Sequence, residues 1–132
     1  MQLSAFLQEF LNELEIKEPL PQEIPGVYTL PLDEGLSITI SSISQGFILT
    51  STIAPAPKQK EEEFYMQALL ANLFGQGTKG AILSLSEEGR MLTLSRNIDY
   101  DVSYKEFREI LEDFINIIDF WRDEALNFHT IS

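Results

Sequence analysis

The sequence has no cysteine, a single histidine and few basic residues. The lack of cysteine in 132 residues excludes disulfides, thiolate metal ligands and a cysteine nucleophile. His129 stands close to the C-terminal end, where chains usually fray, so a Ser-His-Asp triad built on it is not expected. We therefore expect no catalytic residue, no metal site and no cofactor, and we do not expect an enzyme.

The scarcity of positive charge limits the possible partners. Nine Lys and Arg residues stand against 21 Asp and Glu residues, which gives a formal net charge of −12. Such a surface repels phosphate backbones and anionic lipid headgroups, so neither nucleic acid nor a membrane is an expected partner. The first residues carry no basic stretch, and Gln8, Glu9 and Glu13 interrupt the apolar residues that follow. This is unlike a signal peptide or a membrane span, and a cytoplasmic protein is expected.

The first half of the chain predicts one helix and three strands. Hydrophobic residues make up 44% of the sequence, enough for one packed core, and we expect a single domain over residues 1–132. Apolar residues at three- and four-residue steps predict a helix over 4–14, which ends before Pro19. Alternating apolar and polar residues with short turns then predict antiparallel strands over 27–32, 36–42 and 47–53.

The second half predicts two more helices and two strands. A helix is expected after the charge run at 58–63, followed by a hairpin of strands over 81–85 and 91–95. Ser103 and Glu106 have the spacing of a capping box at the start of a long last helix. The fold class is therefore α+β, in the order α-β-β-β-α-β-β-α, with helices packed on an antiparallel twisted sheet.

Two motifs suggest ligand sites, and neither has the right context. Residues 75–80 read GQGTKG and match the GxGxxG pattern, but they follow a predicted helix and precede a strand, the reverse of a dinucleotide site. A helix end followed by a turn explains them better. Asp99 and Asp101 resemble the start of a calcium loop, but Tyr104 and Ile110 stand where glycine and a bidentate glutamate are needed.

Apolar surface is the remaining functional feature. The first two predicted helices carry wide apolar faces, and a small sheet leaves unpaired strand edges. Any one of these apolar residues is more often core than interface. Together with strand edges they favour a dimer interface or a site for an extended peptide.

The chain resembles the class I type III secretion chaperones, the Tir chaperone or CesT/SycE-like family. The resemblance is strongest between residues 69 and 126, and the first 60 residues match only in pattern and acidity. The matching segments are LANLFGQGT at 70–78, GAILSL at 80–85, GRMLTLSR at 89–96, FIN at 114–116 and WR at 121–122.

The resemblance implies a bacterial, ATP-independent chaperone. Such a protein would bind the N-terminal segment of a secreted effector in extended form, keep it soluble and present it for export. It would act as a homodimer, or as a heterodimer with a related chaperone. The implied dimer contacts are Met66, Leu69, Leu70, Leu73, Phe74, Ile82 and Leu83. The implied client-binding residues are Phe6, Leu7, Phe10, Ile38, Ile40 and Phe47.

Two other functions remain open at this point. A regulatory adaptor could bind transcription or secretion-apparatus proteins through the same dimer and sheet surfaces. An enzyme would need a pocket that holds a carboxylate of strongly raised pKa, and nothing in the sequence points to one. The nature of the partner, a folded domain or an unfolded segment, would separate the adaptor from the chaperone.

Overall fold

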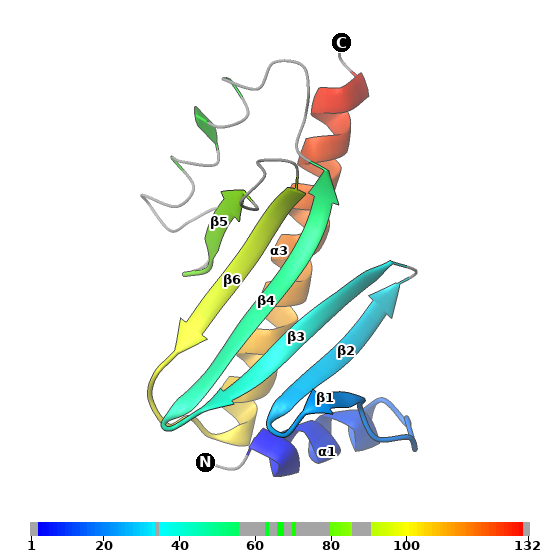
Figure 1. Cartoon of the computed structure of the whole chain (residues 1–132), viewed down its shortest axis with the longest axis vertical. Helices are drawn as coiled ribbons and strands as arrows, with labels where there is room; N and C mark the ends of the chain where they lie inside the picture. Colours follow the sequence, from blue (N-terminus) through cyan, green and yellow to red (C-terminus); the bar gives the residue numbers. More distant parts are fainter. Residues whose placement is uncertain are drawn as a thin grey trace.

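The computed structural model describes residues 3–33, 35–55, 63, 66–67, 70, 80–85 and 91–130 (Figure 1). Within these ranges a six-stranded antiparallel sheet is packed by two long helices, so the predicted α+β class is confirmed. The helices are α1 (Leu3–Glu13) and α3 (Tyr104–Thr130). The strands are β1 (Gln22–Ile24), β2 (Val27–Asp33), β3 (Leu36–Ile43), β4 (Gly46–Pro55), β5 (Ile82–Leu85) and β6 (Met91–Ile98).

The sequence pattern missed β1, the short strand between two prolines. Its three residues are too few to show alternation, and they pair with β2 across the turn at Pro25 and Gly26. The pattern also ended β6 too early, because the strand continues through Arg96, Asn97 and Ile98. The predicted second helix falls largely outside the described residues, although Glu63, Met66, Gln67 and Leu70 are helical.

The strand order is β1-β2-β3-β4-β6-β5. The hairpins predicted from the turns, β2 with β3, β3 with β4, and β5 with β6, are all present and antiparallel. The β4–β6 ladder runs from Phe47 paired with Ile98 to Pro55 paired with Met91. It joins the two halves of the chain into one sheet.

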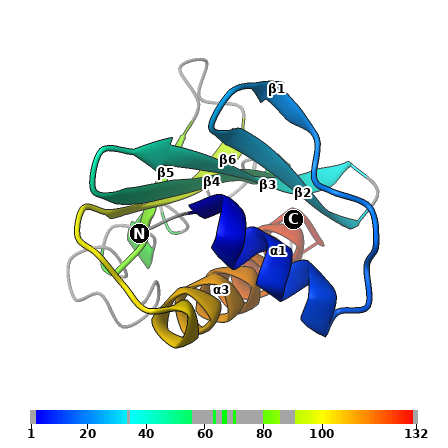
Figure 2. The ribbon, with the colours of Figure 1, turned by 90° about the horizontal axis from the view of Figure 1, so that it is seen from below.

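Both helices lie on the same face of the sheet (Figure 2). The side chains on that face are the apolar set of each strand, for example Ile40 opposite Leu49 and Leu83 opposite Leu94. On the opposite face, which neither α1 nor α3 covers, Thr39 pairs with Thr50 and Thr50 pairs with Ser95. An alternation of period two therefore decides which face enters the core, and in the β4–β6 ladder the register shifts between Thr52 and Ala54.

The helix ends follow known capping chemistry. The Glu106 N–H donates to Ser103 Oγ at 3.2 Å and the Ser103 N–H donates to Glu106 Oε1 at 3.1 Å, which confirms the predicted capping box. At the C-terminal end of α1, the Ile16 N–H donates to the Leu11 carbonyl at 2.9 Å and Glu15 has a φ of 59°. This is a Schellman ending with glutamate where glycine is usual.

Strands β3 and β4 separate halfway along their length. Starting from the turn between them, the last residues paired in the β3–β4 ladder are Thr39 and Thr50. Beyond this pair the two strands diverge (Figure 1). Ser51, which is buried, lies at the start of the gap and its hydroxyl donates to the Ser37 carbonyl at 2.8 Å. A side chain thus links β3 and β4 at the fork, where the backbone ladder has ended.

Candidate functional site

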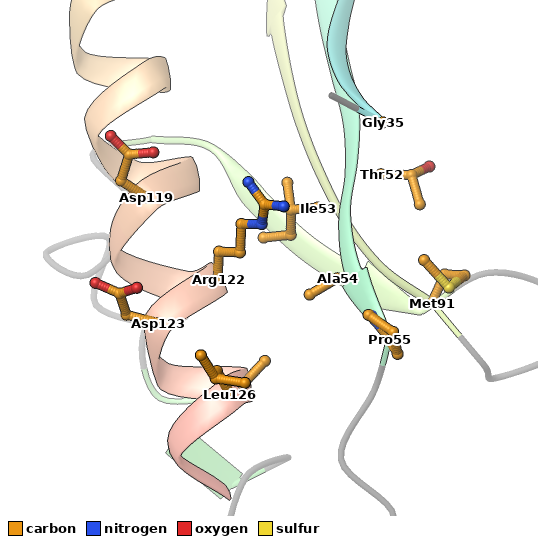
Figure 3. A pocket seen from close by; sticks show the side chains of 11 residues that line it. Gly35, Thr52, Ile53, Ala54, Pro55, Met91, Asp119, Arg122, Asp123 and Leu126 are labelled. Atoms are coloured by element: carbon orange, nitrogen blue, oxygen red, sulfur yellow. The ribbon is translucent and has the colours of Figure 1, made fainter. Parts of the chain in front are cut away.

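A groove of about 890 Å³ opens at the fork between β3 and β4 (Figure 3). One wall is the end of β4 with Ile53, Ala54 and Pro55, and the other is the C-terminal half of α3 with Ala125 and Leu126. Its size is within the range of small-molecule and peptide sites, and its floor is apolar. A smaller pocket of about 290 Å³ lies on the hydroxyl-rich face and shares two residues with the groove, Gly35 and Thr52.

The two edges of the sheet also carry exposed apolar side chains. Ile24 on the edge strand β1 is 60% exposed, and Ile82 on the opposite edge strand β5 is 58% exposed. Leu14 and Ile16 are exposed on the connector that runs from α1 to β1. An unpaired edge with apolar neighbours favours the addition of another strand.

The residues predicted for a dimer interface have different environments. Three of them are exposed in the single chain, as residues of a dimer interface should be before the partner binds: Met66, Leu70 and Ile82. Leu83 is buried because it faces the helices, opposite Leu94. The other three, Leu69, Leu73 and Phe74, lie outside the described residues.

The residues predicted to bind a client are mostly core residues. Each of them is an apolar position of α1 or of the helix-facing side of the sheet, where the α1 and α3 side chains already cover it. The buried ones are Leu7, Phe10, Ile38, Ile40 and Phe47. The sequence pattern identified the apolar face correctly but did not show that the chain's own helices occupy it.

Phe6, the remaining predicted client residue, belongs to an aromatic cluster. Its ring centroid lies 5.9 Å from that of Tyr104 and 5.4 Å from that of Phe107. Phe107 in turn meets Phe47 edge-on at 5.2 Å. The cluster joins α1, α3 and β4, so Phe6 has a structural role in holding α1 on the sheet.

A polar cluster at the end of α1 reinforces this contact. The Tyr104 hydroxyl donates to Glu13 Oε2 at 3.0 Å, and Arg108 Nη1 donates to Glu13 Oε1 at 3.3 Å. Burial raises the pKa of Tyr104 to about 12, and the hydrogen bond to Glu13 and the charges of Glu13 and Glu9 add to the effect. The neutral phenol is therefore the form that stabilises the α1–α3 contact.

We expect stability to fall in alkaline solution because of Tyr104. Its pKa is raised from 10.0 to about 12 on folding, so its contribution is complete below pH 10 and is lost as the pH rises toward 12. Tyr104→Phe should remove this part of the pH dependence, measured as the urea midpoint from neutral to alkaline pH. Tyr100→Phe, which removes an exposed phenol, is the control. If both variants keep the wild-type profile, Tyr104 is not the group responsible.

The possible metal ligands among the described residues are dispersed. No group of three or more His, Asp or Glu side chains among them is arranged to hold a metal ion. Asp99 and Asp101, the start of the rejected calcium loop, are exposed. Among the described helices, none is long and apolar enough to cross a membrane. Gly80, the last residue of the GxGxxG match, forms a turn with φ of 88° just before β5, in agreement with a strand following the motif.

Comparison with known proteins agrees with this architecture. The family model of the Tir chaperone protein (CesT) family matches residues 5–122. A curated protein of Chlamydia pneumoniae is 27% identical over 121 residues, which cover 90% of this chain and 92% of the relative.

Two solved structures have the same fold. One is the HopA1–SchA chaperone–effector complex, with a TM-score of 0.67, 19% identity and coverage of 90% of this chain and 91% of the other. The other is the Yersinia pestis type III secretion chaperone SycH in complex with a fragment of YscM2, with a TM-score of 0.65, 18% identity and coverage of 89% and 97%. Identities this low show the fold alone, whereas the family model spans nearly the whole chain. The family predicted from the sequence is thus confirmed, and the chain belongs to the Tir chaperone protein (CesT) family.

Proposed function

We propose that this protein is a type III secretion chaperone that binds the N-terminal segment of a secreted effector in extended form. The observation that carries the proposal is the family match over residues 5–122. A similar fold in a chaperone–effector complex supports it. Bound client is kept soluble and is presented to the export machinery.

The β1 edge is the proposed client-binding surface. It replaces the client-binding residues that the family resemblance implied, because most of those are buried. The three residues of β1 pair only with β2 in the described sheet, so their other side is open to a client backbone. Ile24, Leu14 and Ile16 border this edge or its connector and expose apolar surface for client side chains. Strand addition supplies main-chain hydrogen bonds, and the apolar neighbours supply selectivity.

The proposed mechanism needs no ATP. A client that binds through backbone pairing and apolar contacts is withdrawn from aggregation by mass action alone. Part of the gross interaction energy is spent on ordering the client, so release requires no large input. Binding by this means is passive and reversible.

The β5 edge is the proposed dimer surface, either with a second copy or with a related chaperone. Ile82 and Leu85 are exposed on β5, and Met66 and Leu70 are exposed on the helical residues before it. The dimer and client surfaces then lie on opposite edges of the sheet, because β1 and β5 are its two end strands. Each can be changed without touching the other.

Ile24→Lys tests the client surface. A charge on this exposed side chain should weaken client capture by about tenfold, because a client side chain would have to desolvate it. The measurement is co-purification with the secreted partner from the source bacterium, followed by titration of the partner's N-terminal segment. Ile82→Lys makes the same change on the β5 edge. We expect it to lower the native mass of the complex by disrupting the dimer and to leave client binding at β1 unchanged. Equal capture by Ile24→Lys and the wild type would remove β1 from the proposal.

The native complex separates the chaperone from the adaptor. We expect two copies of this chain, or one copy with a related chaperone, and one secreted protein protected from protease only near its N-terminus. A monomer, or a complex with folded cytoplasmic proteins alone, would favour the regulatory adaptor, which would use the same dimer and sheet surfaces.

A further inference from the structure

Arg122 places a positive charge inside the groove at the β3–β4 fork. Its side chain extends from α3 toward Ile53 of β4 (Figure 3). A guanidinium has five N–H donors. In the part of the chain that the structure describes, no hydrogen bond or ion pair engages those of Arg122. The groove therefore combines an apolar floor with a cation that has donors to spare.

The nearby negative charges lie on the rim of the groove. Asp119 and Asp123 border it, but Figure 3 shows their carboxylates on the side of α3 that faces away from β4. Of the three charged residues that line the groove, Arg122 is thus the one whose charged group points toward β4, although the whole chain has a net charge of −12. A ligand carboxylate that reaches the guanidinium can form a bidentate pair with it.

The β4 backbone next to this cation has one side without a strand. From Ser51 to Pro55, β4 keeps its pairs with β6, and no described strand pairs with it on the side of the fork. An extended peptide can lie along such a strand and alternate its side chains between the floor and the solvent. Leu126, which is 60% exposed, and Ala125 line the groove from the α3 side.

We propose that this groove is a second anchor for an extended client segment, and that it selects a carboxylate flanked by apolar residues. The client's Asp or Glu pairs with Arg122, and its neighbouring apolar side chains contact Ile53 and Leu126. This inference rests on the proposed function for the class of ligand. It adds a sequence preference that apolar patches and strand edges alone do not provide.

Two synthetic peptides test the preference directly. Both are blocked at their ends and alternate Ser and Leu, and they differ only in having Glu or Gln at the central position. Binding is followed by NMR through the Arg122 side-chain N–H and the Ile53 and Ala125 methyl signals. We expect the Glu peptide to shift these signals and to bind about tenfold more tightly than the Gln peptide, because a charge-assisted pair is stronger than a neutral hydrogen bond.

Variants of the groove separate charge from packing. Arg122→Gln should abolish the preference for Glu and leave the affinity for the Gln peptide nearly unchanged, whereas Arg122→Lys should retain part of it. Lys105→Gln, which removes an exposed charge at the start of α3, is the control with the same change in net charge. Leu126→Ser changes only an exposed side chain, so it keeps the fold and should weaken both peptides alike.

Several results would overturn the inference. Equal affinity for the two peptides, no binding of either at millimolar concentration, or signal shifts away from the groove would each do so. Shifts of Arg122 that appear on concentrating the protein without peptide would assign the groove to a second copy of the chain instead. Absence of a Glu preference in the wild-type protein, together with normal capture of the client by the β1 edge, would overturn this anchor and leave the proposed function in place.

Discussion

Gly46→Ala should destabilise the protein by about 3 kcal/mol or more, because two costs add at this position. Gly46 has a φ of 120°, a conformation that L side chains rarely adopt. A Cβ on Gly46 would also overlap the carbonyl oxygen of Ile98 on the neighbouring strand β6. The backbone of the β4–β6 ladder would have to move, and the pairing of Phe47 with Ile98 begins there.

Gly35→Ala is the matched control for this substitution. Gly35 also has a positive φ, 75°, but among the described residues nothing lies within 4 Å of the added Cβ. Only the backbone strain remains, so we expect a loss of about 1 kcal/mol. Urea unfolding at one protein concentration measures both variants. Similar losses for the two glycines would show that the contact with Ile98 relaxes at little cost.

Phe107→Ala should lower the free energy of unfolding by about 3–5 kcal/mol. Phe107 is 0% exposed and sits between Phe6 of α1 and Phe47 of β4. Truncation leaves a cavity where the two helices and the sheet meet, and it also removes ring contacts worth about 0.5–1.5 kcal/mol each. We expect α1 to lose its attachment first, since Phe6 is part of the same cluster.

Phe120→Ala, on the same helix, provides the comparison. Phe120 is exposed and meets Trp121 edge-on at 5.4 Å, so its removal opens no cavity and should cost less than about 1 kcal/mol. Urea titration followed by circular dichroism gives both values, and proteolysis at the end of α1 reports its release. Equal losses would mean that the aromatic cluster contributes no more than an exposed ring.

The main elements could be predicted from the sequence because each has a strong local signal. The Ser103–Glu106 spacing gave the start of α3, and the alternation of Leu36, Ile38 and Ile40 gave β3 and its buried face. β1 was missed because three residues between prolines carry no periodicity. Its existence depends on pairing with β2, which is a tertiary effect.

The functional surfaces were harder to predict. Apolar periodicity shows that Ile38 and Ile40 share a face, but it does not show whether the chain's own helices or a partner cover it. Ile24 had no signal, since a single isoleucine beside a proline is common. Arg122 appeared only in the WR segment of the family resemblance, and an arginine in a long helix does not by itself indicate a site. Their importance comes from the end of the strand order and from the fork beside Ser51, both of which appear only when the strands are assembled.

The position of α3 after every strand affects how the protein is made on the ribosome. The strands from β1 to β4 are joined by short turns and can pair as they emerge, but β6 closes a much longer loop to reach β4. Until Phe107 and the rest of α3 arrive, the apolar face with Ile38, Ile40 and Leu49 has only the cover of α1. Translation that stalls before Tyr104 would therefore leave a nascent sheet whose hydrophobic face is only partly covered, the kind of surface that aggregates.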